Sequence, residues 1–149
     1  MIYTLDSQLR LTKTSKTGDV IWDIHLRDTK DLPAVASIGL AYYKGLIYAV
    51  SGDGVIYAVE PEGEIIWQND TDKILRSAPV IYDEKLFVLS ANNELLALNI
   101  KDGSLVWNYK NMEPETNLLG MGIPAVAKNT IVVPFSTGEI IAFNVKTGE

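Results

Sequence analysis

The sequence predicts an all-β protein, a β-propeller segment of about 3.5 four-stranded antiparallel blades forming an incomplete ring. The first observation is a repeat, in which Gly18, Gly63 and Gly103 each precede a tryptophan by four residues. With Gly148 included, these glycines are spaced 45, 40 and 45 residues apart. The second is that no stretch keeps a helical period of apolar residues over three turns. The third is that candidate strands such as Leu46–Ser51 are apolar on both faces, as strands between packed blades are.

Each copy of the repeat reads as an apolar strand, a tight turn closed by the glycine, and a second strand that carries the tryptophan. An alanine stands shortly before two of the glycines, Ala58 before Gly63 and Ala97 before Gly103. Trp22, Trp67 and Trp107 keep a fixed spacing from their turns, so we interpret them as structural residues and not as a stacking surface for a cofactor.

The repeat divides the single domain, 1–149, into four units. The first two are 1–26, a partial blade, and 27–68, a whole one. Their expected strands are Met1–Leu5, Leu9–Thr14, Val20–Leu26, Leu40–Tyr43, Leu46–Ser51, Val55–Val59 and Glu64–Gln68. Gly52, Asp53 and Gly54 form a hairpin turn whose residues tolerate a positive φ.

The other two units are 69–110, a whole blade, and 111–149, a partial one. Their expected strands are Ala78–Tyr82, Leu86–Ser90, Glu94–Asn99, Ser104–Tyr109, Ile123–Ala127, Ile131–Phe135 and Glu139–Asn144. Pro79 and Pro124 begin strands, where a missing N–H does least harm. Both ends of the sequence cut through a unit, so we expect a piece of a longer protein, with open sheet edges through which copies could self-associate.

Composition excludes several classes of function. The net charge of −6 lacks the basic patch that nucleic acid needs, so no nucleic acid is expected as a partner. The absence of cysteine excludes disulfides and thiolate sites, and the single histidine, His25, leaves a histidine metal site or a Ser/His triad little to work with. No apolar run is long enough to span a membrane, and no signal peptide is visible.

The pattern of Ala97, Asn99, Asp102, Gly103 and Trp107 resembles the tryptophan-docking motif of quinoprotein-type propellers, which have PQQ-like repeats. In that family the indole of the outer strand stacks between neighbouring blades. WD-type propellers fit poorly, because the Trp-Asp dipeptide occurs once and no Gly-His pair is present.

Within that group the chain is most similar to the BamB family, propeller lipoproteins of the machinery that assembles β-barrel outer-membrane proteins. The similarity covers nearly the whole chain and includes the order of long and short connections between units. It implies a place on the periplasmic face of the outer membrane and a BamA-type partner. The sequence departs from the family pattern at Leu119, where arginine is common.

The resemblance makes the connection before Pro124 the candidate partner-binding loop, together with the equivalent connection before Pro79. Apolar residues concentrated in a long polar loop suggest an interaction patch, although such a loop can also fold back and bury them itself. The candidate partner-binding residues are Met112, Thr116, Leu118, Leu119, Met121, Leu75 and Arg76.

Other chemistry-bearing residues have simpler interpretations. Asp53 lies in a two-glycine turn, where turn chemistry is commoner than calcium binding. Glu94 and Glu139 could line a central channel, but solvated strand ends explain them better, and His25 fits a surface position.

No nucleophile constellation, acid/base pair or phosphate-binding loop is recognisable, so we expect a non-catalytic scaffold without a metal or cofactor. Two alternatives remain. The first is a propeller segment of a PQQ-dependent dehydrogenase, whose relatives hold the quinone with calcium at the centre of the ring. The second is a sensor or adhesion propeller.

Overall fold

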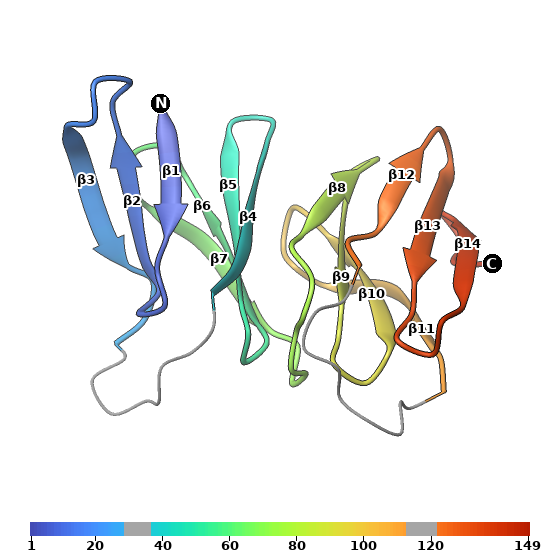
Figure 1. Cartoon of the computed structure of the whole chain (residues 1–149). Helices are drawn as coiled ribbons and strands as arrows, with labels where there is room; N and C mark the ends of the chain where they lie inside the picture. The colour runs from blue at the N-terminus through green and yellow to red at the C-terminus, as the bar shows by residue number, and fades with distance from the viewer. Residues whose placement is uncertain (29–36, 113–121) are drawn as a thin grey trace.

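The described residues of the chain form four antiparallel sheets in the computed structural model (Figure 1). The structure describes residues 1–28, 37–112 and 122–149. These ranges contain fourteen strands and no helix. They therefore include no helix that is long and apolar enough to cross a membrane. The sheets stand side by side and do not close a ring, which confirms the predicted all-β segment of a propeller.

The first two sheets are simple meanders with the strand orders β1-β2-β3 and β4-β5-β6-β7. Their strands are β1 (Ile2–Leu5), β2 (Arg10–Thr14), β3 (Val20–His25), β4 (Ser37–Tyr43), β5 (Leu46–Ser51), β6 (Val55–Val59) and β7 (Ile65–Asp70).

The other two sheets repeat the meander, with the orders β8-β9-β10-β11 and β12-β13-β14. Their strands are β8 (Val80–Tyr82), β9 (Lys85–Leu89), β10 (Glu94–Asn99), β11 (Leu105–Lys110), β12 (Ala125–Ala127), β13 (Thr130–Pro134) and β14 (Ile140–Asn144). We refer to the four sheets in chain order as blades 1 to 4.

The first strands of consecutive blades are neighbours. Strand β1 packs beside β4, β4 beside β8, and β8 beside β12. The tryptophan-bearing strands β3, β7 and β11 form the opposite edges of their sheets. The blades therefore stand in an arc with their first strands inside and their tryptophan strands outside.

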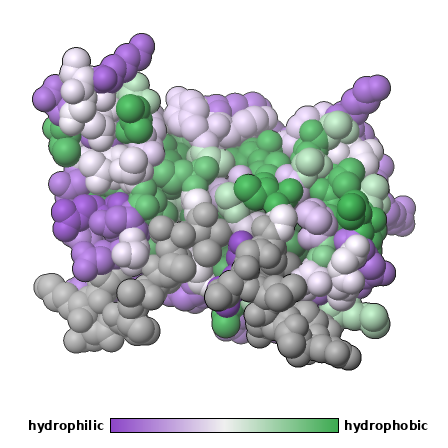
Figure 2. Space-filling view, in the orientation of Figure 1, coloured by the Kyte–Doolittle hydropathy of each residue, from purple (hydrophilic) through white to green (hydrophobic). Residues whose placement is uncertain are grey.

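Each gap between neighbouring blades encloses its own hydrophobic core. Strands β6 and β10 contribute to two cores at once, since Ile56 and Tyr57 face different neighbours, as do Leu95 and Leu96. Figure 2 shows hydrophobic side chains gathered across the middle of the visible face, with hydrophilic residues toward the margins. The two-sided apolar pattern of these strands thus has a direct cause, which is burial on both faces.

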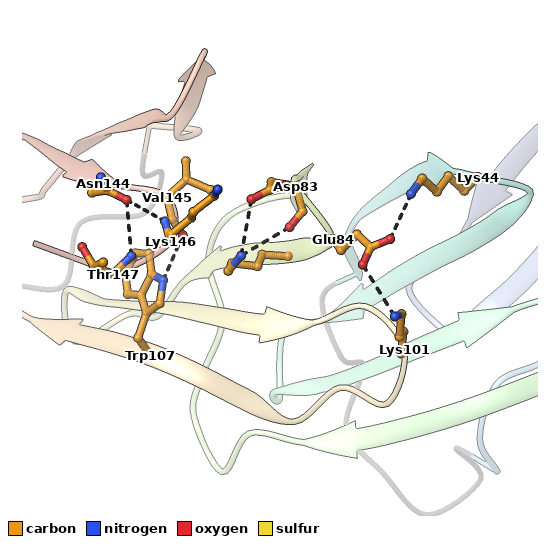
Figure 3. A network of polar contacts seen from close by, with 10 residues as sticks. Lys44, Asp83, Glu84, Lys101, Trp107, Asn144, Val145, Lys146 and Thr147 are labelled. Carbon is orange, nitrogen blue, oxygen red and sulfur yellow. Dashed lines mark hydrogen bonds and ion pairs between the residues drawn. The ribbon is translucent and has the colours of Figure 1, made fainter.

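The three indoles dock on the next blade by one hydrogen bond each. Trp22 Nε1 donates to the carbonyl of Pro61 at 3.0 Å, and Trp67 Nε1 donates to that of Ile100 at 3.0 Å. Trp107 Nε1 donates to the carbonyl of Val145 at 3.1 Å (Figure 3). Each acceptor lies in the turn that follows the third strand of the next blade, so every indole ties its blade to the one after it.

The turn glycines lie against these same indoles. A Cβ on Gly103 would lie 2.7 Å from Cζ3 of Trp67, while one on Gly63 would make ordinary contact with Trp22 at 3.7 Å. Within each blade, Ala58 pairs with Trp67 across the strands and Ala97 pairs with Trp107, and both alanines are fully buried. Small residues therefore lie on both sides of Trp67 and Trp107, whereas the cross-strand partner of Trp22 is Lys13.

A bulge precedes every tryptophan. The register between the last two strands shifts by one residue at the same place in blades 1, 2 and 3. The unpaired residue is in each case an exposed aliphatic one immediately before the indole: Ile21, Ile66 and Val106. A classic bulge bends its strand and increases the local twist.

Some strands begin elsewhere than the sequence predicts. Strands β8 and β12 start after Pro79 and Pro124 and not before them, because proline cannot donate to the ladder. Strand β4 starts at Ser37, earlier than expected, and Leu9 belongs to a turn, with a φ of 56°.

Candidate interaction face

The turns that join the second and third strands of blades 2, 3 and 4 lie at one end of the sheets, which we call the hairpin face. Its central element is the β9–β10 turn, residues 90–93. Asn93 has a φ of 57°, a conformation that asparagine tolerates better than most residues, and its side chain is fully buried. The pair Asn92-Asn93 thus lies in the turn of the hairpin between β9 and β10.

Asn93 connects three segments of this face. Its Nδ2 donates to the carbonyl of Met112 at 3.1 Å, and its backbone carbonyl accepts from the N–H of Asn111. Its Oδ1 accepts from the Ser136 hydroxyl at 2.9 Å and from the Ser136 backbone N–H at 3.2 Å. Because Ser136 belongs to the β13–β14 turn, one buried amide joins blade 3, blade 4 and the start of the connection between them.

The connection from blade 2 runs along the other side of the same turn. The N–H of Ala91 donates to the carbonyl of Ile74 at 2.7 Å, and the N–H of Arg76 donates to that of Leu89 at 2.9 Å. The β9–β10 turn therefore holds the backbones of both connections that reach blade 3 and blade 4.

Leu75 does not belong to the exposed part of this face, which corrects the expectation that it contacts a partner. Its side chain is fully buried in the core between blades 2 and 3, and its backbone bridges to Ser90. The neighbouring Ile74 is 58% exposed instead, and Arg76 is half-buried. Sequence alone could not decide which of two adjacent aliphatic residues points inward, because a connection has no fixed period.

Met112 is 72% exposed although its backbone is fixed by Asn93, and Ile123 is 60% exposed. Together with Ile74 they are large apolar side chains on the borders of the two connections. The other candidate residues of the loop, Thr116, Leu118, Leu119 and Met121, lie outside the described residues.

Polar side chains cross from each blade to the next on this face. Arg27, which follows β3, pairs with Asp53 of the β5–β6 turn, and Lys73, which follows β7, pairs with Glu94 at 3.0 Å. The third contact is a hydrogen bond of 2.8 Å, from Asn111 Nδ2 to Glu139. The residues that follow the outer strands β3, β7 and β11 thus make polar side-chain contacts with the second hairpin of the next blade.

These contacts shift the pKa values of the acids involved. Burial works to raise the pKa of Asp53, but hydrogen bonds from Ser51 and Arg27 outweigh it, and the pKa is lowered. Burial likewise works to raise the pKa of Glu94, but hydrogen bonds from Asn108 and Lys73 outweigh it, and the pKa is lowered. Hydrogen bonds from Asn111 and Thr137 lower the pKa of Glu139.

Glu94 is not a solvated strand end, which corrects that interpretation. It is 6% exposed, and its carboxylate accepts from Asn108 Nδ2 at 2.7 Å besides its ion pair with Lys73. Glu139 is exposed, as is His25 at the end of β3. Asp53 accepts a hydrogen bond from Ser51 within its own turn at 2.6 Å. Across 1–28, 37–112 and 122–149, no three His, Asp or Glu side chains come together as a metal site.

The opposite end of the sheets carries a different polar contact. Glu84 accepts from Lys44 of blade 2 at 3.0 Å and pairs with Lys101 at 3.6 Å (Figure 3). All three side chains are well exposed, so this triad contributes little stability. The buried, shape-determining contacts of the connections are on the hairpin face.

Comparison with known proteins gives a consistent result. Residues 6–149 match the family model described as outer membrane protein assembly factor BamB. The chain is 28% identical to BamB of Yersinia pestis over 139 residues, covering 89% of this chain and 35% of that protein. An uncharacterized protein of Rickettsia prowazekii is 24% identical over 152 residues, covering 100% of this chain and 36% of that protein.

The fold has a close counterpart among solved structures. The crystal structure of BamB from Moraxella catarrhalis superposes with a TM-score of 0.80 at 20% identity, covering 96% of this chain and 43% of that one. The chain therefore spans about a third of the length of these curated relatives. At this level of identity the superposition shows a shared fold.

Proposed function

Because the chain belongs to the family of the outer membrane protein assembly factor BamB, we propose that it acts as a non-catalytic scaffold in the assembly of β-barrel outer-membrane proteins. Its working surface in this proposal is the hairpin face, and its partner is a BamA-type protein. The place of action is the periplasmic face of the outer membrane.

The observation that carries the proposal is the fixed β9–β10 turn with exposed apolar side chains on both sides of it. Asn93 and Ala91 hold the backbones of Met112 and Ile74, so these large side chains stay at the surface without the freedom of an unanchored loop. Pre-organised apolar residues lose little conformational entropy on binding, which is what a docking surface needs.

The proposal also assigns the docking role to the remainder of the connection from Met112 to Met121, including Thr116, Leu118 and Leu119, with Arg76 on the neighbouring connection. Met112 lies at the beginning of that connection and Ile123 just after its end. Both are exposed, so the described borders of the loop have the apolar character that its sequence shows.

The test is a binding measurement between this chain and the soluble periplasmic part of a BamA-type protein from the same source. Charged substitutions Leu118→Glu with Leu119→Glu, and separately Ile74→Glu with Met112→Glu, are expected to weaken binding at least ~10-fold, or ~1.4 kcal/mol. The matched control is Val20→Glu, a substitution on the outer strand of blade 1 where the side chain is 62% exposed.

Circular dichroism of each variant separates a lost contact from a lost fold. Unchanged affinity in both double variants, with the wild-type chain bound, would rule out the hairpin face as the docking surface. An equal loss in Val20→Glu would assign the effect to general damage.

A further inference from the structure

The guanidinium of Arg76 differs from the other cations that approach the β9–β10 and β5–β6 turns. Arg27 pairs with Asp53. Lys73 Nζ lies 3.0 Å from the carboxylate of Glu94. Arg76 is half-buried, yet within 1–28, 37–112 and 122–149 its side chain makes no hydrogen bond and no ion pair. Its charge is therefore available to a carboxylate from outside the described residues.

The backbone that carries Arg76 is fixed by a short antiparallel ladder. The N–H of Arg76 donates to the carbonyl of Leu89 at 2.9 Å, and the N–H of Ala91 donates to the carbonyl of Ile74 at 2.7 Å. The next residue, Ser77, accepts the N–H of Leu89 on its hydroxyl at 2.8 Å. The guanidinium thus extends from a held backbone, which limits the conformational entropy that binding would cost.

Ile74 and Arg76 lie on the same side of this ladder. Leu75, between them, forms a β-bridge with Ser90, and its side chain is fully buried in the core between blades 2 and 3. Successive side chains of a ladder point to opposite sides, so Ile74 and Arg76 point away from that core. Ile74 is accordingly 58% exposed. With a rise of about 3.3 Å per residue, the two side chains leave the backbone about 7 Å apart.

A surface of this kind is complementary to an aliphatic side chain beside a carboxylate. The planar guanidinium can donate two parallel hydrogen bonds to one carboxylate, and the charges strengthen both. The net charge of −6 does not attract acidic proteins over a distance. Recognition of an acid by this chain therefore depends on the local contact at Arg76.

We propose that Arg76 receives an aspartate or glutamate side chain of the docking partner, beside an aliphatic side chain that packs on Ile74. The inference rests on the proposed function, since it names the partner chemistry that the hairpin face recognises. In an extended partner segment the acidic and the aliphatic residue are two positions apart, which is the spacing of Ile74 and Arg76 themselves.

The experiment measures binding of the chain to the periplasmic part of a BamA-type protein at several salt concentrations. Arg76→Gln removes the charge and should weaken binding at least ~10-fold at low salt, with a smaller dependence of the affinity on salt. Arg76→Lys keeps the charge without the planar fork, so its affinity should lie between the two. The matched control is Lys101→Gln at the opposite end of the sheets, where the lysine side chain is 72% exposed and no loss is expected.

The outcomes separate this inference from the proposed function. If the wild-type chain binds and Arg76→Gln binds equally well with the same salt dependence, the role of Arg76 is overturned and the proposed function stands. A wild-type chain that does not bind overturns both. Restoration of binding between Arg76→Glu and a partner in which one acidic residue is replaced by lysine would support the inference and identify that acid.

Urea denaturation of the free chain tests whether Arg76 acts within the chain instead. Arg76→Gln and Lys101→Gln should unfold at the same urea concentration as the wild-type chain, because neither guanidinium nor ammonium holds a buried acid there. A lower midpoint for Arg76→Gln alone would mean that its charge is paired inside the chain, and the inference would be wrong.

Discussion

The turn at Gly148 lies directly on the indole of Trp107. A Cβ at Gly148 would come within 2.7 Å of Cδ2 of that ring, while the indole N–H binds the carbonyl of Val145 three residues earlier (Figure 3). The same relationship joins Gly103 to Trp67 and, with more space, Gly63 to Trp22. In each repeat the indole of one blade's outer strand thus packs against the turn of the next blade and donates a hydrogen bond to it. We call this pair of contacts the lock.

Replacing Gly103 by alanine should destabilise the chain. The new methyl would meet the rigid ring of Trp67 at 2.7 Å, and the φ of 73° disfavours any residue with a Cβ. Gly18→Ala is the matched control, since its φ is 96° but nothing lies within 4 Å. Urea denaturation should show a larger loss for Gly103→Ala, by roughly 1–3 kcal/mol. Equal losses of unfolding free energy in the two variants would mean that the Trp67 ring moves to make room for the methyl group without an energetic penalty.

Truncating the indole of Trp67 tests the lock from the other side. Trp67→Ala should lower the free energy of unfolding by about 3 kcal/mol, the lower end for large aromatic side chains, because this ring is half-buried. Trp67→Phe keeps a ring and loses the hydrogen bond to Ile100, so its loss should be about 1 kcal/mol. If chemical denaturation shows that Trp67→Phe loses as much unfolding free energy as Trp67→Ala, the hydrogen bond contributes more to stability than the packing of the ring.

Asn93 is expected to be the residue most sensitive to small changes on the hairpin face. Asn93→Ala leaves the partners Met112 and Ser136 unsatisfied and strains a φ of 57°, so a loss of about 2 kcal/mol is expected. Asn93→Gly removes the same contacts without the strain and should cost less. Thermal unfolding of the two variants compares them. A glycine variant as unstable as alanine would show that backbone strain plays no part.

The carboxylate of Glu94 should make stability depend on pH in the acid range. Its folded-state pKa is lowered, so its contribution is fully present above its ordinary pKa, about 4.5. The contribution is lost as the pH falls from there through the lowered folded value. Unfolding free energies measured from pH 6 to pH 3 should therefore decline less steeply in Glu94→Gln.

The exposed Glu64 provides the control for this pH series. Glu64→Gln should leave the acid decline close to that of the wild-type chain. A wild-type decline that survives unchanged in Glu94→Gln would assign the acid sensitivity to other carboxylates, with Asp53 the first candidate because its pKa is lowered too.

The fold could be predicted because its determinants are local and repeated. The spacing of Trp67 and Trp107 from Gly63 and Gly103 defines strand, turn and strand within a dozen residues, and burial on both faces appears directly in the composition of the strands. Nothing beyond the chain's own short-range pattern is needed for that inference.

The environment of single polar residues could not be predicted in the same way. Glu94 begins β10 and Glu139 immediately precedes β14, but Glu94 is buried and Glu139 exposed because different residues of the preceding blade face them. Lys73, which pairs with Glu94, is 21 positions away in the sequence and shares no motif with it. The inward turn of Leu75 and the role of Asn93 likewise depend on which connections pass beside the β9–β10 turn.

The bulge ahead of each tryptophan has a consequence for how the protein behaves at high concentration. Straight, apolar outer strands are templates on which a second molecule can extend a sheet. In blades 1 to 3 the extra exposed aliphatic residue shifts the register of the outer strand, and such a bulge bends the strand. The outer strand therefore does not present a long, flat edge with which another strand could pair. A protein whose described regular structure consists of strands alone thereby carries, beside every indole, a built-in obstacle to fibre growth.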